Sequence, residues 1–454
     1  MFKRNIINDM IQWAEKPNRK PLVLRGARQV GKTSVVKLFS TGFKQYIYFN
    51  LEIDAHKNIF SNATNFNDLL QQIFLQSNTQ IQLKKDTLIF IDEIQEVPEV
   101  FNWLRYFYEN EPDIKVIAAG SLLETLFKKE ISFPVGRVEY MVIRPVSFQE
   151  FLAAIGEEEA LKELIKIPFE NYAYDKLFQL FHQYALIGGM PEVVQNYLSE
   201  RNIAGLQNIY NSLITAYEDD IEKYAKNTSA INYLRHAIQS VYAEAGKRIK
   251  FHGFGKSNYG SLEMGEALRT LEKAFLIKLM YPVTNAQLPL IPNKRKAPRL
   301  QVLDTGLLNF SVGIQSELIG TKNLEATYNG LVIEHLVGQE LLTLNKFTLT
   351  ALPFWVREKN TSSAEVDYLH LYKGKLIPVE VKSGEVGKLK SLHLFMDEAP
   401  HQTAIRFCAA KQSITPITTA AGKNYFLLTL PYFSVSQINN WLEWFEEEIK
   451  TFKK

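Results

Sequence analysis

The stretch LVLRGARQVGKTSVVKLF, at residues 22–39, constrains the fold more than any other part of the chain. Gly26, Gly31, Lys32 and Thr33 fill the pattern GxxxxGK[ST], between an apolar run and a helical pattern. In a strand–loop–helix setting, the glycines let backbone N–H groups wrap around a phosphate, and the helix N-terminus adds its positive dipole end. The stretch therefore predicts a phosphate-binding loop in an α/β domain.

The residue types in this loop point to ATP with Mg²⁺. Lys32 is expected to reach the β- and γ-phosphates, and the Thr33 hydroxyl is expected to bind the metal ion. A glycine-rich turn without a ligand is the alternative. The nucleotide-binding residues assigned to the loop are Gly26, Ala27, Arg28, Gln29, Val30, Gly31, Lys32, Thr33 and Ser34.

Two later strands supply candidate catalytic residues for ATP hydrolysis. TLIFIDEIQEVP is an apolar strand that ends in Asp92 and Glu93. Asp92 is expected to hold Mg²⁺ through its water shell, and Glu93 to orient or deprotonate the attacking water. KVIAAGS predicts another buried strand, after which Ser121 would point from the same carboxyl edge toward the γ-phosphate. Helix N-capping is the alternative role for Ser121.

Composition excludes several classes of protein. The chain has 454 residues, enough for about two to four domains, with 46% hydrophobic and 22% charged residues, as in soluble globular proteins. A net charge of +3 means that nucleic-acid binding would need local basic patches. A single cysteine, Cys408, excludes an internal disulfide framework. Without a signal-like segment or a run of 18 apolar residues, a cytoplasmic protein with no membrane partner is expected.

Several stretches together resemble one family. They are GARQVGKT, IDEIQ, AAGSLLE, GRVEYMVIRPVSFQEF, LIGGMPEVV, LDTGLL and EVDYL…IPVEVKSG, and they extend over nearly the whole chain. They are similar to a small group of prokaryotic AAA-type ATPases in which a P-loop domain precedes a domain of unknown function. The resemblance implies an AAA-like αβα sandwich. It also implies that the GGMP turn, at residues 188–191, contacts adenine, although a turn between two helices explains the same residues.

AAA enzymes complete their site with an arginine from a neighbouring subunit, because the transition state carries charge on the γ-phosphoryl group. Arg137 in VGRVEY is the first candidate for this arginine and Arg28 the second. A surface role fits either residue as well. An arginine acting in trans would make the protein a homo-oligomer.

The middle of the chain is predicted to be helical and to contain a winged helix. SNYGSLEMGEALRTLEKAFLIKLMYPV gives a turn, an amphipathic helix and an apolar strand, with four side chains facing the core: Ala267, Leu268, Leu271 and Phe275. Two basic clusters bracket it: Lys247, Arg248, Lys250 and Lys256 before it, and Lys294, Arg295, Lys296 and Arg299 after it. These clusters either neutralise nucleic-acid phosphates or serve solubility.

The C-terminal third contains a candidate metal site in EVDYLHLYKGKLIPVEVKSG. If Lys373 and Gly374 form a two-residue hairpin turn, Asp367 falls opposite Glu380, and Glu365 opposite Lys382. Two facing carboxylates repel unless a cation or a proton lies between them. Mg²⁺ suits such a pair of acids.

The order acid, Asp, Glu-x-Lys resembles the PD-(D/E)xK nuclease superfamily, of the Holliday-junction resolvase style. The resemblance implies that Glu334 is the helix acid, Asp367 and Glu380 the metal ligands, and Lys382 the catalytic lysine. It also implies that Lys388 and Lys390 lie on a helix that meets phosphates. Val366 stands where proline precedes the aspartate in the strict motif. An active nuclease, a nuclease-like fold that does not cut, and a structural salt-bridge cluster all stay open.

The fold expected is therefore a multidomain α/β protein. Four domains are predicted: an AAA-like P-loop ATPase domain at 1–160, a helical lid at 161–225, a winged-helix-like region at 226–300, and a restriction-endonuclease-like α/β domain at 301–454. The function expected is ATP hydrolysis coupled to DNA binding or Mg²⁺-dependent DNA processing. The alternative is a nucleotide-driven switch or scaffold whose C-terminal domain recognises a partner without catalysis.

Overall fold

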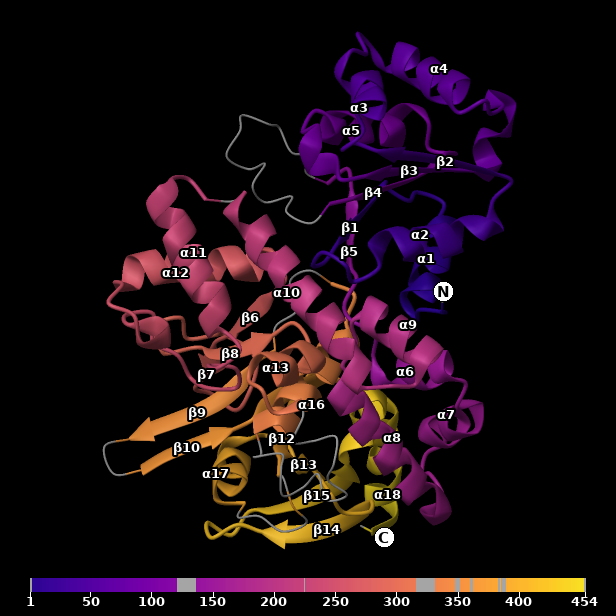
Figure 1. The fold of residues 1–454 in the computed structure, drawn as a ribbon. Coiled ribbons are helices and arrows are strands. Elements are labelled where there is room, and N and C mark those ends of the chain that lie inside the picture. The colour runs from indigo at the N-terminus through magenta and orange to yellow at the C-terminus, as the bar shows by residue number, and fades with distance from the viewer. Residues whose placement is uncertain are drawn as a thin grey trace. The chain divides into compact units, whose positions relative to one another are not determined.

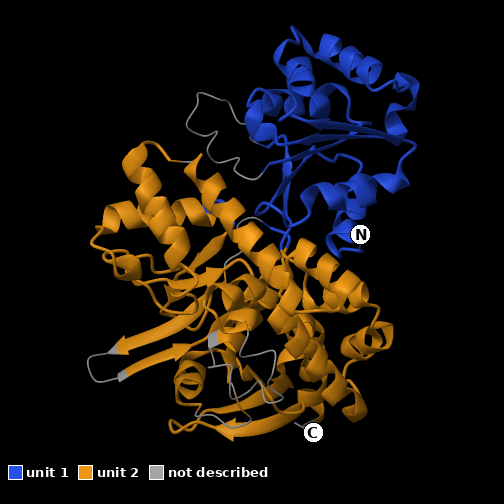
Figure 2. Ribbon diagram, in the orientation of Figure 1, with its two compact units in different colours: residues 1–144, 273–275, 346–349 blue, residues 145–272, 276–345, 350–454 orange. Residues whose placement is uncertain are grey.

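The computed structural model describes residues 2–120, 136–223, 225–315, 331–347, 352–359, 362–382, 384 and 389–452. The chain forms two compact units, coloured separately in Figure 2. Unit 1 comprises residues 1–144, 273–275 and 346–349, and unit 2 comprises residues 145–272, 276–345 and 350–454. The finer division into four domains stays a prediction.

Unit 1 is built on a parallel sheet of five strands in the order β2-β3-β4-β1-β5. Its strands are β1 (Leu22–Arg25), β2 (Gln45–Asn50), β3 (Thr87–Asp92), β4 (Lys115–Ala119) and β5 (Glu139–Val142). Because all five run in one direction, their carboxyl ends meet at one edge, where ligands bind in sheets of this class. The predicted α/β architecture of this part is confirmed.

Helices cover the sheet of unit 1, with α3, α4 and α5 on one side and α1 and α2 on the other (Figure 1). They are α1 (Ile6–Glu15), α2 (Lys32–Phe39), α3 (Asp54–Ser61), α4 (Phe66–Gln76) and α5 (Val100–Asn110). A continuous apolar core joins the α3–α5 side to the sheet through buried residues such as Phe60, Leu69, Phe101, Ile89 and Ile91. This core fixes the strand ends that carry the site.

Unit 2 begins with a series of helices. They are α6 (Phe148–Ile155), α7 (Glu158–Ile165), α8 (Tyr174–Ile187), α9 (Pro191–Glu200), α10 (Gln207–Glu222), α11 (Thr228–Ser240) and α12 (Ser261–Lys273). Local sequence explains their starts: Ser147 and Glu150 form a capping box on α6, Pro191 opens α9, and the Asn227 side chain accepts from Ala230 N on α11.

The predicted core face of α12 is confirmed in part. Ala267, Leu268 and Leu271 are buried. Phe275 is half-buried and lies beyond the helix end at Lys273, with a left-handed φ of 62°. The expectation that Phe275 continues the helical spacing was therefore wrong, because the helix ends two residues earlier. The apolar strand that follows is β6 (Ile277–Met280), which pairs antiparallel with β8 (Arg299–Val302). The winged helix itself stays a prediction.

The C-terminal part of unit 2 contains a mixed sheet in the order β11-β12-β13-β15-β14. A separate small sheet has the order β10-β9-β7. The strands are β7 (Pro282–Val283), β9 (Phe354–Lys359), β10 (Ser362–Val366), β11 (Tyr368–Tyr372), β12 (Lys375–Val381), β13 (Thr403–Cys408), β14 (Ser413–Thr418) and β15 (Asn424–Pro431). The helices are α13 (Thr305–Ser311), α16 (Leu331–Thr343), α17 (Lys390–Glu398) and α18 (Ile438–Phe452).

A shared core holds these last elements together. Leu392, Phe395 and Met396 of α17 pack with Leu369 of β11 and Leu376 of β12. Cys408 is buried, as predicted. None of the described helices combines the length and the apolar character needed to cross a membrane.

Candidate nucleotide site and carboxylate cluster

The loop between β1 and α2 depends on glycine at both ends. Gly26 has a φ of +142°, and a Cβ there would lie 2.3 Å from the Ile143 carbonyl oxygen. Gly31 has a φ of +92° and is the N-cap of α2. Between them, Gln29 adopts a left-handed φ of 62°. A loop held in sparsely populated conformations at the start of a helix has the form needed to present backbone N–H groups to a phosphate.

Lys32 places its ammonium group inside this loop. Its Nζ donates to the carbonyl oxygens of Gly26, at 3.1 Å, and Ala27, at 2.8 Å. The residue is buried, whereas Thr33 and Ser34 beside it are exposed. The Lys32 ammonium therefore lies within the loop at the N-terminus of α2. The hydroxyl groups of Thr33 and Ser34 beside it are open to a ligand.

Asp92 joins the loop to the end of β3. Thr33 Oγ1 donates to Asp92 Oδ2 at 2.6 Å, and Glu93 N donates to Asp92 Oδ1 at 3.1 Å. Burial raises the pKa of Asp92, and the negative charge of Glu93 adds to this, while the bond from Thr33 acts in the opposite direction. The predicted pairing of Thr33 with Asp92 in one site is present in the structure.

Glu93 is turned out of the strand by a left-handed backbone, with a φ of 55°. Gln95 Nε2 donates to Glu93 Oε2 at 2.5 Å and fixes the carboxylate. A non-glycine residue in this conformation costs about 1–3 kcal/mol, a strain that clusters at functional sites. The two adjacent acids thus point different ways, Asp92 to Thr33 and Glu93 to Gln95.

One neighbour of this site was missed from the sequence. Tyr48 of β2 lies beside Asp92, and its pKa is raised to about 12, first by burial and then by the charges of Asp92 and Glu93. The signal was available in the parallel register, because Asn50 pairs with Asp92 and Tyr48 lies on the same face of β2 two residues earlier.

The two candidate arginines of the ATP site contact acids of unit 1, and the candidate Ser121 lies outside the described residues. Arg28 lies 3.8 Å from Glu52. Arg137 contacts Glu109 Oε1 at 2.9 Å and precedes β5, whose first residue is level with Leu22 of β1. Arg137 therefore lies at the amino edge of the sheet, opposite the loop that follows the carboxyl end of β1.

The GGMP turn of unit 2 packs against the LDTGLL stretch. Gly189 N donates to Asp304 Oδ2 at 2.6 Å, and Asp304 also caps α13 by accepting from Leu307 N at 3.1 Å. Gly188 has a φ of +74°, and a Cβ there would lie 2.3 Å from Asp304 Oδ1. The two stretches therefore pack against each other in the interior of unit 2. Contact of this turn with adenine stays a prediction.

The C-terminal hairpin has the register that the sequence predicts. Lys373 and Gly374, both with positive φ, form the turn, and Tyr368 pairs with Val379. In this register Asp367 falls opposite Glu380, one residue beyond the last pair of the two strands, and its Oδ2 accepts from Val381 N at 2.8 Å. The expected pairing of Glu365 with Lys382 is wrong. Glu365 belongs to β10 and pairs with Val356, because the chain leaves the hairpin at Asp367 for another sheet.

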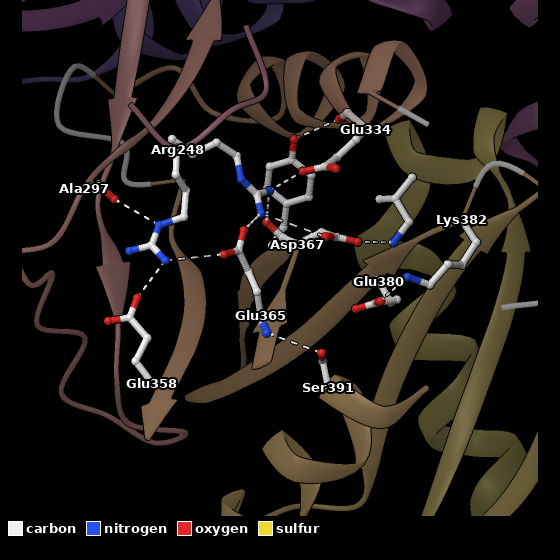
Figure 3. Close-up of polar contacts among 12 residues, drawn as sticks. Arg248, Ala297, Glu334, Glu358, Glu365, Asp367, Glu380, Lys382 and Ser391 are labelled. Carbon is white, nitrogen blue, oxygen red and sulfur yellow. Dashed lines mark hydrogen bonds and ion pairs between the residues drawn. The ribbon is translucent and has the colours of Figure 1, made fainter. Parts of the chain in front are cut away.

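A buried arginine, Arg299, lies beside two of the predicted nuclease acids, Glu334 and Asp367. The Arg299 guanidinium contacts the carboxylates of Glu334 and Glu365, and its Nη1 donates to the Asp367 carbonyl oxygen at 3.0 Å. Figure 3 shows Glu334, Glu365 and Asp367 converging on this point. Burial lowers the pKa of Arg299, but these carboxylates raise it further, so the guanidinium stays charged. Arg299 was expected in an exposed basic cluster, and that expectation was wrong.

Two other members of the basic clusters also form ion pairs within unit 2. Arg248 Nη1 contacts Glu358 Oε1 at 2.7 Å, and Lys296 pairs with the other oxygen of Glu358. Neighbouring carboxylates thus balance Arg248, Lys296 and Arg299. This reduces the positive charge that these clusters offer to nucleic acid.

Glu380 and Lys382 form an ion pair at the end of β12, beside Asp367. Burial raises the pKa of Glu380, and the negative charge of Asp367 raises it further. Glu380 is buried, and its Oε2 has no hydrogen-bond partner among the described residues. Among the described residues, no group of three or more His, Cys, Asp or Glu side chains is arranged to hold a metal ion. Lys390 begins α17 and Lys388 lies outside the described residues.

Comparison with known families agrees with the geometry of unit 1. Residues 18–152 match the family described as AAA domain. Unit 1 therefore carries an AAA-like P-loop domain. Residues 178–318 match Domain of unknown function (DUF8612), and residues 329–421 match Domain of unknown function (DUF4143). Among curated proteins, none is similar enough to this chain to count as a match.

Two solved structures are similar to parts of the chain. The Walker-type ATPase PABY2304 of Pyrococcus abyssi is 14% identical, with a TM-score of 0.45 over 69% of this chain and 96% of that chain. The Pif1 helicase from Candida albicans is 13% identical, with a TM-score of 0.21 over 39% of this chain and 48% of that chain. The assignment of the ATPase domain rests on the AAA match, the loop and the parallel sheet.

Proposed function

We propose that the chain hydrolyses ATP to ADP and phosphate in unit 1, with Mg²⁺ bound. The observation that carries this proposal is the hydrogen bond from Thr33 to Asp92, which brings the loop hydroxyl and the acid at the end of β3 to 2.6 Å. Oxygen donors of these two kinds, together with phosphate oxygens, are the ligands that Mg²⁺ prefers. The loop between β1 and α2 also fits a phosphate, because only glycine is accommodated at the position of Gly26.

Different residues of the chain have separate roles in the proposed reaction. Backbone N–H groups of the loop and the Lys32 ammonium would hold the phosphates, and Thr33 and Asp92 would hold the metal ion, which would supply positive charge to the phosphate oxygens. Glu93, fixed by Gln95, orients a water molecule and accepts its proton. The water oxygen forms a bond to the γ-phosphorus as the bond to the β–γ bridging oxygen breaks. We assign Ser121 to sensing the γ-phosphate.

Arg137 would stabilise the transferred phosphoryl group of a neighbouring copy. Its place at the amino edge of the sheet supports action in trans, because the loop of its own chain follows the opposite edge. The protein would then hydrolyse ATP as a homo-oligomer. Arg28, within the loop, is the second candidate.

The test of hydrolysis is the release of phosphate from ATP with and without Mg²⁺. Lys32→Ala should abolish the activity, because it removes the charge held inside the loop. Lys37→Ala, which changes an exposed lysine of the same helix, is the matched control and should keep it. Full activity of Lys32→Ala would contradict the proposal.

For the C-terminal part of unit 2, we infer partner recognition without DNA cleavage, driven by the nucleotide state. The position of Arg299 supports this role, because its guanidinium pairs with Glu334 and lies 4.0 Å from the Asp367 carboxylate, two acids that a nuclease would use. The position of Asp367 beside Glu380 and Lys382 supports the second candidate, Mg²⁺-dependent DNA processing by a restriction-endonuclease-like domain.

Incubation of plasmid, linear and branched DNA with Mg²⁺ or Mn²⁺, with and without ATP, distinguishes the two roles. We expect no cleavage. Cleavage that is lost in Asp367→Ala and in Lys382→Ala would instead establish the nuclease. Stimulation of the ATPase rate by DNA without cleavage would identify DNA as the recognised partner.

A further inference from the structure

We propose that the Arg299 guanidinium is the resident cation of the carboxylate cluster, and that its removal converts this cluster into a binding site for one divalent cation. The inference deepens the proposal that the C-terminal part does not cut DNA. It does not depend on ATP hydrolysis, and its test measures cation binding rather than cleavage.

The cluster carries more negative than positive charge once Arg299 is removed. Four carboxylates meet here, those of Glu334, Glu365, Asp367 and Glu380, and the cations beside them are Arg299 and Lys382. Arg248 reaches Glu365 Oε2 only at 3.9 Å and makes its closer contact with Glu358. Carboxylates that face one another repel unless a cation or protons lie between them, so the Arg299 charge stabilises the cluster.

The groups that surround the guanidinium are those that a hard divalent cation binds. They are two carboxylates, of Glu334 and Glu365, and the carbonyl oxygen of Asp367 at 3.0 Å from Nη1. The Asp367 carboxylate lies 4.0 Å from Nη2. Carboxylate and backbone carbonyl oxygens are the ordinary ligands of Ca²⁺, Mg²⁺ and Mn²⁺. Arg299 therefore lies among oxygen atoms of the kinds that bind a metal ion, although with Arg299 in place no three acids of the described residues are arranged to hold one.

The cluster also contains an acceptor that Arg299 does not satisfy. Glu380 has only 4% of its surface exposed, and within the part of the chain that the structure describes its Oε2 has no hydrogen-bond partner, although Lys382 contacts Oε1. Asp367 lies beside it, held by Val381 N. A buried carboxylate oxygen without a donor is costly. A divalent cation in the space left by the guanidinium would have this oxygen within the same group of acids.

The surroundings of Arg299 indicate a permanent occupant. The guanidinium lies over the Phe354 ring at 4.7 Å and at 5.9 Å from the Tyr368 ring, distances at which aromatic faces attract a cation. Tyr368 in turn donates from its hydroxyl to the Glu334 carbonyl oxygen at 2.8 Å. Only 3% of the Arg299 surface is exposed. Two positive charges do not share such a buried position, so a metal ion and Arg299 exclude each other.

The test is a titration of the full chain with Mn²⁺ in the absence of nucleotide, in which free Mn²⁺ is measured by electron paramagnetic resonance. We expect Arg299→Gln to bind one more Mn²⁺ per chain than the unchanged protein. Adding Asp367→Asn to Arg299→Gln should weaken that binding about tenfold or more, because one carboxylate charge of the cluster is lost. Arg248→Gln is the matched control and should gain no site, because Arg299 stays in place.

Each other outcome counts against the proposal. Equal Mn²⁺ binding by the unchanged protein and Arg299→Gln would show that the guanidinium blocks nothing. Binding that persists unchanged with Asp367→Asn would place the ion elsewhere. If Arg299→Gln fails to fold in metal-free buffer, the proposal requires Mn²⁺ to raise its Tm or restore its solubility, and failure in both buffers would overturn it.

Discussion

Thr33 Oγ1 and Asp92 Oδ2 are 2.6 Å apart, although 59 residues separate them in the sequence. The hydrogen bond ties the first turn of α2 to the carboxyl end of β3, across a sheet in which β4 lies between β3 and β1. It brings a hydroxyl and a carboxylate together beside the loop that holds Lys32. Because the loop and the end of β3 form this site together, a change in either of them should alter nucleotide binding.

Glu93→Gln should separate nucleotide binding from hydrolysis. The amide keeps the shape of the side chain but accepts no proton, so kcat should fall between about 100- and 10,000-fold while the Kd for ATP stays nearly unchanged. Phosphate release and the binding of a fluorescent ATP analogue measure the two effects. Glu96→Gln, which changes an exposed acid three residues later, is the control. An unchanged kcat in Glu93→Gln would assign the proton to another group.

Gly26→Ala should damage the loop itself. The new Cβ would meet the Ile143 carbonyl oxygen at 2.3 Å, in a backbone conformation with a φ of +142° that alanine avoids. A lower Tm, by an amount equivalent to about 1–3 kcal/mol, and a loss of ATP binding are expected. Gly42→Ala is the matched control, because nothing lies within 4 Å of its new Cβ. Equal effects of the two substitutions would contradict this account of the loop.

Arg137→Ala should lower kcat by about 1,000-fold or more without weakening ATP binding, if Arg137 completes a neighbouring site. Arg105→Ala is the matched control, because Arg105 contacts the same Glu109 oxygen at 3.1 Å. The decisive measurement mixes Arg137→Ala with Lys32→Ala. Each variant supplies the part that the other lacks, so activity should exceed that of either variant alone. No recovery in a stable mixed oligomer would exclude action in trans.

The sequence predicted unit 1 well because its signals are local. The loop pattern, the apolar strand before Gly26 and the acids after β3 each lie within a few residues, and a parallel sheet brings their carboxyl ends to one edge. The register of the β11–β12 hairpin was predictable for the same reason, since a two-residue turn fixes which residues face each other.

The role of Arg299 was not predictable in this way. Arg299 begins β8, and its contacts with Glu334, Glu365 and Asp367 join this strand to α16 and to the end of β10. The three acids lie 35 to 68 residues from Arg299 in the sequence. The local pattern around it, KRKAPR, is typical of an exposed basic segment. The predicted pairing of Glu365 with Lys382 was also wrong, because nothing in the sequence indicates that the chain leaves the hairpin for another sheet at Asp367.

The buried carboxyl group of Glu340 should make unit 2 less stable as the pH rises from about 4.5 to about 7. Burial raises its pKa from 4.5 to about 7, while Tyr184 and Phe148 N, which donate to Oε1 at 2.7 and 3.0 Å, act in the opposite direction. The folded state therefore keeps a proton that the unfolded chain releases over this range. The free energy of unfolding should fall by up to about 3 kcal/mol before it levels off.

Glu340→Gln removes this dependence, because the amide oxygen accepts the same two hydrogen bonds and does not ionise. The Tm of the variant should match that of the unchanged protein near pH 5 and exceed it near pH 8. The raised pKa of Asp304, about 6, affects both proteins and cancels in the difference. Glu159→Gln, at an exposed acid of α7, should leave the pH profile unchanged. Parallel profiles for Glu340→Gln and the unchanged protein would show that Glu340 titrates alike in the folded and unfolded chain.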